Sequence, residues 1–337
     1  MRRYVLRAQP SGKLTPICEE IANPEAGAGE VLVAMKAASL NYRDLLVTSG
    51  NMGGDGIVPL SDGAGEVIAV GEGVAKFQVG DRVALTFFNE WDDGPFDMLY
   101  HRAARGGSSD GVMAEFVAAK ANGVVKIPDH LSDVEAACLP CAALTAWQAL
   151  FERGQPFGEG QSLLCLGTGG VSVCALQMAT AAGGEVIITS SSDEKLERAK
   201  ELGAAHTINY KSVPDWDQQA WGLTNKRGVN HVMEVGGPGT FEKSMKAVGA
   251  GGTISMIGVL TGFDPSPAGL FPLVSKAVNL HGIYVGSHAM FERMNAFLAE
   301  HQIKPIVDRV FPFGELTAAY DYLESGSHFG KVVVEIG

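Results

Sequence analysis

The sequence predicts an α/β protein with two domains, one β-rich and one built on a doubly wound parallel sheet. Residues 1–127 contain short strand patterns separated by glycines, with no regular alternation of strand and helix. Residues 128–287 alternate strand and helix patterns and include six strand candidates, as expected for a doubly wound sheet. Residues 288–337 carry two helical patterns and a final strand, which we expect to return to the first domain.

The strands of the first domain are predicted from short patterns of alternating or glycine-bounded apolar residues. The segment 31–36, VLVAMK, alternates two sets of side chains, as a strand with one buried face does. Further strands are predicted at residues 65–70, 81–85 and 113–117.

The second domain is predicted to begin with a helix over residues 135–152. Ser132 and Glu135 have the spacing of a capping box ahead of it. Strands are then predicted at residues 162–166, 185–190, 206–209, 231–235, 253–257 and 280–284, with helices between them. In the last part of the chain we expect helices at 290–300 and 316–325 and a strand at 331–336.

A glycine turn follows the first of these six strands. The run 163–166 is fully apolar, which is typical of a parallel strand covered on both faces. The turn contains Gly167, Gly169 and Gly170, where no side chain blocks the approach of a pyrophosphate to the backbone. The helix predicted over 171–182 would hold that anion with its first amides and its dipole.

The next strand strengthens this interpretation. Ser172 replaces the third glycine of the G-x-G-x-x-G pattern, so we expect the helix to sit slightly further from the strand. A second strand, 185–190, ends roughly twenty residues after the turn, as in dinucleotide-binding folds. The segment therefore predicts a Rossmann domain and a cofactor-using enzyme.

The end of the second strand indicates the cofactor. NAD-specific sites place Asp or Glu there, whereas this strand ends in Ser190 and Ser191. Their hydroxyls can donate to a 2′-phosphate, and Lys195 adds positive charge. We therefore expect NADPH (NADP⁺). The alternative is that the serines only cap the next helix and Lys195 is solvated.

Composition excludes several classes of partner. The net charge is −12, and no basic cluster is present, so we expect neither nucleic acid nor an acidic membrane as a partner. No apolar stretch approaches the length of a membrane span, and the start lacks a signal-peptide pattern, so we expect a cytoplasmic protein. The five cysteines are expected to be reduced. Cys138 and Cys141 have the spacing of a redox or zinc pair, or are simply buried thiols.

Three motifs, in this order, resemble those of the medium-chain dehydrogenase/reductase superfamily. They are SDGAGEVIAVGEGVAKFQVGDRV at 61–83, CAALTAWQAL at 141–150, and the GTGGVS turn followed by TSSSDEKLERAKELGA. The chain is most similar to the quinone oxidoreductase-like branch, which includes proteins called zinc-type alcohol dehydrogenases. The resemblance implies a GroES-like catalytic domain, a Rossmann cofactor domain, hydride transfer and a homodimer, but it does not identify the substrate.

The resemblance also assigns the positions at which zinc-using members hold a catalytic metal. In this chain they are Asn41, Ser61 and Cys141, and only the last is a zinc-binding residue type. Catalytic zinc takes three Cys, His or carboxylate ligands. The four-cysteine lobe of zinc members would lie in residues 87–111, which contain no cysteine. We therefore expect no metal.

By the same resemblance, the catalytic candidates are Asn41, Tyr42, Arg43 and Asp62. A tyrosine hydroxyl can donate to a developing oxyanion, and a guanidinium can stabilise one. The alternative is that Arg43 pairs with Asp44 at the start of a short helix while Tyr42 packs. Asp62 has two possible roles. It could take part in the polar chemistry of the site, or it could bond to the backbone of its own turn.

The remaining cofactor positions also follow from the resemblance. Thr145 is expected to contact the carboxamide of the nicotinamide, unless it only bonds back to its own helical turn. Tyr210 matches a position that meets the 2′-phosphate in similar reductases. The other expected contacts are Val171, Gly236, Ile257, Val259 and Ser287.

The stretch 86–111 is long and rich in aromatic residues, with no clear period. Loops of this length are often lids or binding walls. Its aromatic residues could line a substrate cleft or could anchor the loop to its own domain: Phe87, Phe88, Trp91, Phe96 and Tyr100.

Two enzyme functions and one other function remain open. The leading one is a metal-independent, NADPH-dependent reductase of a small quinone, enone or related activated carbonyl. The second is an alcohol dehydrogenase or aldehyde reductase, and the third is a non-enzymatic nucleotide-binding protein. We expect a homodimer that pairs across the sheet edge at 279–284, because an open apolar edge strand favours aggregation.

Overall fold

The computed structural model describes residues 1–50, 52–264 and 269–337, which form two compact units. Unit 1 comprises Met1–Leu144 and Val285–Gly337, and unit 2 comprises Thr145–Tyr284. The sequence-based boundary at 127/128 differs from this division. The helix α2 (Asp133–Ala136) and the turn that follows it pack on strands of unit 1, so residues 128–144 belong with that unit.

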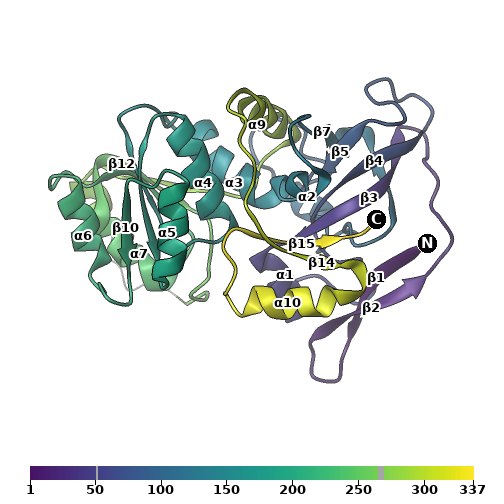
Figure 1. Cartoon of the computed structure of the whole chain (residues 1–337), viewed down its shortest axis with the longest axis horizontal. Helices are drawn as coiled ribbons and strands as arrows, with labels where there is room; N and C mark the ends of the chain where they lie inside the picture. Colours follow the sequence, from purple (N-terminus) through teal and green to yellow (C-terminus); the bar gives the residue numbers. More distant parts are fainter. Residues whose placement is uncertain (51, 265–268) are drawn as a thin grey trace. The chain divides into compact units, whose positions relative to one another are not determined.

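The described part of unit 1 is built on a seven-stranded mixed sheet. Its order is β14-β15-β3-β4-β5-β7, and β6 also pairs with β3 (Figure 1). In chain order, the strands are β3 (Glu30–Leu40), β4 (Asp62–Val70), β5 (Arg82–Leu85), β6 (Phe116–Lys120), β7 (Val124–Lys126), β14 (Val307–Pro312) and β15 (Lys331–Glu335). A separate antiparallel pair consists of β1 (Arg2–Ala8) and β2 (Leu14–Glu20).

The register of this sheet places three strand ends side by side. β3 lies between β15 and β4, with Leu40 opposite Val332 and Ser39 opposite Asp62. The apolar side chains of β3 and β15 are fully buried and form one core with the face of α10 (Leu316–Glu324). The end of β3 and the starts of β4 and β15 are therefore held rigidly together.

The helix predicted over 135–152 is divided into short pieces. The capping box is confirmed: Ser132 Oγ accepts from the Glu135 amide at 3.2 Å, and the Ser132 amide donates to Glu135 Oε2 at 2.7 Å. Pro140 lacks an amide and cannot continue the α-helical ladder. The pieces are α2, a π-helical turn Leu139–Ala143, α3 (Leu144–Trp147) and a second π-helical turn Gln148–Glu152.

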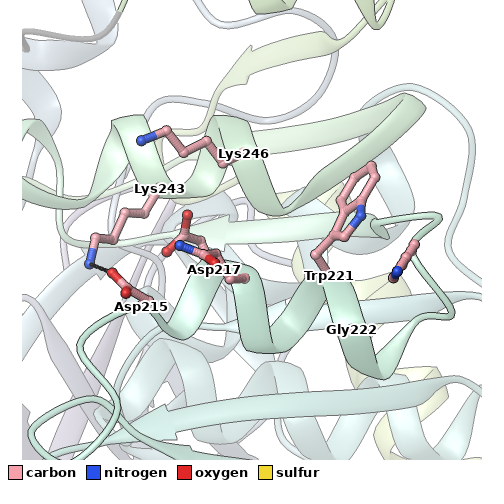
Figure 2. Close-up of a pocket in the computed structure, with 8 residues that line it drawn as sticks. Asp215, Asp217, Trp221, Gly222, Lys243 and Lys246 are labelled. Atoms are coloured by element: carbon pink, nitrogen blue, oxygen red, sulfur yellow. Dashed lines mark ion pairs between the residues drawn. The ribbon is translucent and has the colours of Figure 1, made fainter.

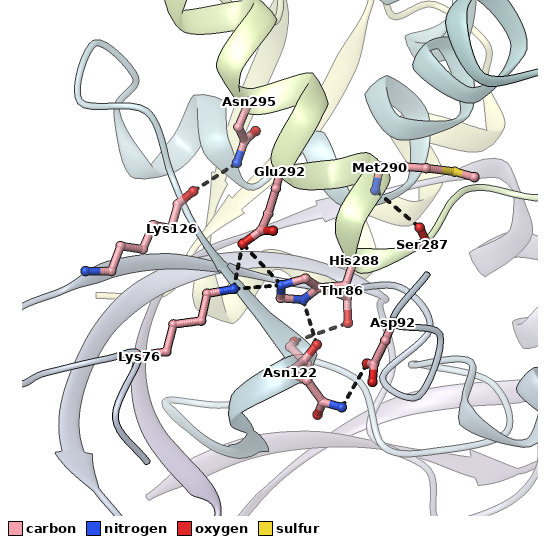
Figure 3. Close-up of polar contacts among 11 residues, drawn as sticks. Lys76, Thr86, Asp92, Asn122, Lys126, Ser287, His288, Met290, Glu292 and Asn295 are labelled. Carbon is pink, nitrogen blue, oxygen red and sulfur yellow. Dashed lines mark hydrogen bonds and ion pairs between the residues drawn. The ribbon is translucent and has the colours of Figure 1, made fainter. Parts of the chain in front are cut away.

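The C-terminal segment is fixed to unit 1 through α9 (His288–Glu300). His288 Nδ1 lies 2.7 Å from the Asn122 carbonyl, and Asn295 donates to the Lys126 carbonyl at 2.9 Å (Figure 3). Lys76 bridges His288 and Glu292 from outside. These bonds join the start of α9 to the strand and turn at 121–126.

The described residues of unit 2 form a six-stranded parallel sheet in the order β10-β9-β8-β11-β12-β13, which confirms the predicted doubly wound class. Helices α4 and α5 cover one face of the sheet, and α6 and α7 cover the other (Figure 1). The strands are β8 (Ser162–Cys165), β9 (Glu185–Ser190), β10 (His206–Asn209), β11 (Val229–Glu234), β12 (Val248–Met256) and β13 (Asn279–Gly282). The helices are α4 (Gly170–Ala181), α5 (Asp193–Glu201), α6 (Trp216–Leu223), α7 (Pro238–Ala247) and the short α8 (Phe271–Ser275).

Some elements of unit 1 differ from the sequence-based expectation. The strand expected at 113–117 is β6 at Phe116–Lys120, because Met113 instead accepts a bond from the Tyr4 amide. Strands β1, β2, β7 and β14 were not predicted, since their apolar residues do not alternate over a sufficient length. In the part of the chain that the structure describes, no helix combines the length and apolarity required to cross a membrane.

Candidate functional site

A buried polar network lies in unit 1 where β3 ends and β4 and β15 begin. Its centre is Lys331, whose side chain is only 3% exposed. The ammonium group donates to the Leu40 carbonyl at 2.6 Å and to Asn41 Oδ1, and lies 4.0 Å from Asp62 Oδ2. The pairing of β3 with β15 and β4 brings these groups together, because Lys331 and Asp62 are far in the sequence from the end of β3.

Asp62 connects this network to the next two positions. Its carboxylate is fully buried and accepts from Ser61 Oγ at 2.7 Å and from the Cys141 amide at 3.1 Å. Burial raises the pKa of Asp62, and the nearby Lys331 ammonium opposes that rise. The backbone amide that Asp62 accepts from lies outside its own turn, and its role in the chemistry stays a prediction.

The network thus joins the three positions that the family resemblance assigns to a catalytic zinc. The residues present do not fit that ion. Asn41 and Ser61 are not zinc-binding types, and the Ser61 hydroxyl already donates to Asp62. Burial raises the pKa of the Cys141 thiol and disfavours the thiolate that a metal requires. Among the described residues, no group of three or more His, Cys, Asp or Glu side chains is placed to hold a metal.

Asn41 begins the short helix α1 (Tyr42–Thr48) and is held at both ends. Its amide donates to Asp44 Oδ2 at 2.7 Å, while its side-chain oxygen accepts from Lys331. Asn41 is 8% exposed, and its Nδ2 is buried with no hydrogen-bond partner among the described residues. Burial raises the pKa of Asp44 to about 6, although Arg43 and the Asn41 amide oppose the rise.

Tyr42 and Arg43 have different environments. Arg43 donates to the Arg105 carbonyl at 2.7 Å, lies over the Phe87 ring at 4.7 Å and is 3.7 Å from Asp44. These contacts favour the structural alternative for Arg43. Tyr42 is 40% exposed, so part of its side chain is open to solvent.

The aromatic residues of the 86–111 stretch pack mainly on one another. Trp91 stacks on Tyr100 with centroids 5.8 Å apart and contacts Phe96 at 5.2 Å. Phe87, Phe88 and Trp91 are each 1% exposed. This packing favours the anchoring alternative over a wall of a substrate cleft.

The glycine turn of unit 2 has the geometry of an anion cradle. Gly167 has a φ of +72°, which glycine adopts without strain because it has no Cβ. Gly169 has an ordinary φ of −79°, and a Cβ added there would meet no protein atom within 4 Å. Neither the backbone conformation nor the packing of neighbouring protein atoms requires glycine at 169, and the space beside it is open.

The start of α4 supplies the donors for this cradle. Gly169 is the N-cap and has no side chain to occupy the first amides, which include those of Gly170 and Val171. Ser172 Oγ donates to the Leu166 carbonyl at 2.7 Å. The serine in place of the third glycine is therefore accommodated by a bond between helix and strand.

The serines at the end of β9 lie beside Tyr210. The Tyr210 amide donates to the Ser190 carbonyl at 3.0 Å, and the Tyr210 side chain is 41% exposed. Ser192 is the residue that caps α5, through a bond from the Lys195 amide at 3.4 Å. Ser190 is 3% exposed, and its hydroxyl accepts from the Ser192 amide at 3.3 Å. Ser191 is partly exposed.

Three further predicted residues gather at the carboxyl ends of β11 and β12. The Ile257 amide donates to the Glu234 carbonyl at 2.9 Å, and Gly236 and Val259 lie in the adjoining turns. Sequence reasoning missed Glu234, whose buried carboxylate accepts from the amides of Gly236 and Gly237 at 2.8 and 2.9 Å. Glu234 is the last residue of β11, and an acidic residue at the end of a mostly buried strand was the available signal.

Thr145 and Ser287 belong to different units. Thr145 is 4% exposed in α3, in unit 2. Ser287 is the N-cap of α9 in unit 1, and its hydroxyl accepts from the Met290 amide at 3.2 Å (Figure 3). Their expected contacts with the cofactor stay predictions.

A surface pocket of 530 Å³ lies beside α6 and α7 (Figure 2). Trp221 borders it together with acidic and basic side chains, and Lys243 lies 3.8 Å from Asp215. None of the predicted site residues lines this pocket, so we do not take it as the functional site.

Comparison with protein families gives two matches. Residues 27–129 match the alcohol dehydrogenase GroES-like domain, and residues 170–300 match the zinc-binding dehydrogenase family. The first match covers most of the seven-stranded sheet, and the second begins at the glycine cradle.

Individual proteins are similar over nearly the whole chain. A zinc-type alcohol dehydrogenase-like protein of Schizosaccharomyces pombe is 46% identical over 99% of both chains. A tomato (Solanum lycopersicum) 2-methylene-furan-3-one reductase is 32% identical over 93% of this chain and 74% of its own. A solved structure of a Sinorhizobium meliloti protein assigned to the alcohol dehydrogenases has a TM-score of 0.92 and 40% identity over 99% of both chains.

Proposed function

Because the chain belongs to the medium-chain dehydrogenase/reductase superfamily and is an NAD(P)H-dependent oxidoreductase, we propose that it uses NADPH to reduce a quinone, an enone or a related activated carbonyl without a metal. The observation that carries this proposal is the donor set at the zinc positions. An amide and a hydroxyl that is already bonded stand where two metal ligands are required.

The residues that would hold the cofactor are those of unit 2. When bound, a nicotinamide cofactor supplies the hydride. The first amides of α4 and the open space above Gly169 suit a pyrophosphate. Ser190 and Ser191, with the exposed Tyr210 beside them, suit a 2′-phosphate, and no acidic residue at the end of β9 repels it.

The polar groups of unit 1 would act on the substrate. Tyr42 presents an exposed side chain whose hydroxyl can donate a proton or a hydrogen bond. Asn41 offers a buried amide donor without a partner among the described residues. Both are neutral donors of the kind that stabilises an oxygen on which negative charge develops.

An alcohol dehydrogenase or aldehyde reductase is the second candidate, favoured by the descriptions of the yeast and Sinorhizobium proteins. In this chain it would require either an unusual metal site or catalysis by Tyr42 and Arg43. The tomato reductase favours the first candidate.

A substrate panel with metal analysis tests the proposal. We expect NADPH oxidation with quinones or enones, no enzyme-bound zinc and no loss of rate with a chelator. About one zinc per chain, with activity lost on chelation and restored by zinc, would instead establish the zinc-type alcohol dehydrogenase. Any turnover of the panel excludes a purely nucleotide-binding role.

A further inference from the structure

We propose that Lys331 is a positioning residue, which orients the Asn41 amide so that Nδ2 donates to the oxygen of the substrate. This inference deepens the proposed function and rests on it for the identity of that oxygen. The residues involved are contributed by strand ends of unit 1, and sequence reasoning did not single out Lys331.

The orientation of the Asn41 amide follows from the chemistry of its partner. An ammonium group only donates hydrogen bonds, so Lys331 must contact the oxygen of the amide and not its nitrogen. A free amide can rotate to exchange its oxygen and nitrogen. Here the backbone bond from Asn41 to Asp44 and the bond from Lys331 fix both ends of the residue.

The nitrogen of the amide is then the group left to bind something else. Asn41 Nδ2 is buried and has no hydrogen bond of acceptable distance and angle among the described residues, although the Asn41 side chain acts as a donor that helps to lower the pKa of Asp62. A buried donor without a partner is costly, and such groups often have a ligand as their partner. A substrate oxygen would accept from it.

The burial of Lys331 itself supports a role beyond packing. The side chain of Lys331 is almost fully buried. Three groups stabilise its positive charge there: the Leu40 carbonyl, Asn41 Oδ1 and the Asp62 carboxylate. An apolar residue in this strand would bury the same surface without that desolvation. The field of the ammonium also polarises the amide, which strengthens Nδ2 as a donor.

The alternative is that Lys331 only clamps β15 to the end of β3. A double-mutant cycle distinguishes the two roles. The variants are Lys331→Met, Asn41→Ala and the double variant, and the readouts are kcat, KM and stability to urea. Lys120→Met is the matched control, since Lys120 is an exposed lysine of the same unit with a single ion pair to Glu90.

If Lys331 acts through Asn41, the loss in kcat is not additive. Asn41→Ala is expected to lower kcat by about a hundredfold, as loss of an oxyanion donor does. Lys331→Met alone is expected to lower kcat by about tenfold, and to have no further effect in the Asn41→Ala background. Losses in kcat that simply multiply, or a Lys331→Met variant with full turnover, overturn the proposal.

A further variant tests the donor role of Asn41 even if Lys331→Met does not fold. Asn41→Asp keeps an acceptor for the ammonium but removes the Nδ2 donor. We expect it to fold and to lose turnover, with KM little changed. Full turnover of a folded Asn41→Asp enzyme contradicts the donor role.

An NMR measurement separates failure of this inference from failure of the proposed function. The Asn41 side-chain amide signals are those that disappear in ¹⁵N-labelled Asn41→Asp. Lys331→Met is expected to shift them or to make them exchange between two orientations, and Lys120→Met is expected to leave them unchanged. Unchanged signals in Lys331→Met overturn the positioning role even if the parent enzyme reduces none of the substrates tested.

Discussion

Tyr42 and Arg43 are adjacent in the chain, yet only the first has a side chain open to solvent. Arg43 is 13% exposed and is held by the Arg105 carbonyl, the Phe87 ring and Asp44. These contacts hold the guanidinium within unit 1, although its Nε is buried with no hydrogen-bond partner among the described residues, so we expect Arg43 to act mainly on stability. The two residues are therefore expected to respond differently to mutation.

Tyr42→Phe should lower kcat more than tenfold, because general acid assistance is worth about 10²–10⁴ in rate. Its stability should change little, since the substitution removes only a hydroxyl from a residue that is 40% exposed. Arg43→Ala should instead lower the free energy of unfolding by about 1–3 kcal/mol, because it leaves a buried carbonyl unpaired. Steady-state kinetics and urea denaturation of both variants check this, and full turnover of Tyr42→Phe would show that the proton comes from elsewhere.

Asp44 gives stability a dependence on pH. Its pKa in the folded protein is raised from 3.8 to about 6 by burial, so the folded state binds the proton more tightly than the unfolded state does. Its contribution to stability is complete below pH about 4 and is lost as pH rises to about 6.

Asp44→Asn should remove this dependence while keeping an oxygen for the Asn41 amide. Relative to Asp44→Asn, the parent should lose on the order of 3 kcal/mol of unfolding free energy between about pH 4 and pH 6, from 1.36 kcal/mol per pKa unit. Urea denaturation of both proteins across this range measures the difference. A constant difference would mean that Asp44 titrates normally.

Ser190 is the residue on which we expect cofactor preference to depend. An aspartate there would repel a 2′-phosphate and accept from a ribose. The parent should show at least a several-fold preference for NADPH in kcat/KM, which should collapse or reverse in Ser190→Asp. Preference of the parent for NADH would refute the assignment.

At the scale of the element, the loop between β8 and α4 contains two glycines with different reasons to be glycine. Gly167 needs its positive φ, whereas Gly169 has an ordinary conformation and free space where a side chain would go. The two positions therefore provide a matched pair of alanine variants.

Gly169→Ala should fold with the stability of the parent but raise the KM for NADPH, because its methyl group occupies the space reserved for the pyrophosphate. Gly167→Ala should lower the free energy of unfolding by about 1 kcal/mol or more, since alanine is strained at positive φ. Thermal unfolding and cofactor titration of the two variants check this. A normal KM in Gly169→Ala would mean that the phosphates bind elsewhere.

At the scale of the whole molecule, the edge of the unit 2 sheet is the candidate for assembly. β13 ends the strand order and exposes 42% of Leu280. A homodimer that pairs this edge across a two-fold axis would satisfy its free backbone groups, in the manner of closed assemblies. The dimer is a prediction from the resemblance and from this edge.

The parent should therefore behave as a dimer in light scattering at micromolar concentration. Leu280→Lys should weaken the dimer, because the two introduced charges would meet near the axis. Val79→Lys is the control, since Val79 is 61% exposed in unit 1. A monomeric parent contradicts the prediction, and equal dissociation of both variants would place the interface elsewhere.

The sequence by itself determined the class of fold and predicted the position of a cofactor cradle. Apolar strands of 4–8 residues separated by helical patterns are local signals, and each of the six predicted strands of unit 2 is present. The glycine turn and the strand ending in Ser190 are likewise contiguous in the chain. Asn41, Tyr42 and Asp62 were predicted from short motifs that resemble those of the family. Their contacts could not be predicted from these motifs.

Only the tertiary structure decided which polar groups meet. The sheet register brings Lys331 beside Asn41 and Asp62, although 290 residues separate the first pair in sequence. In the folded chain, Arg43 also donates to the Arg105 carbonyl, and the aromatic residues of the 86–111 stretch pack on one another. Such contacts depend on the pairing of strands that are far apart in the sequence. They also depend on which polar groups remain without a hydrogen-bond partner after packing. A local sequence pattern predicts neither.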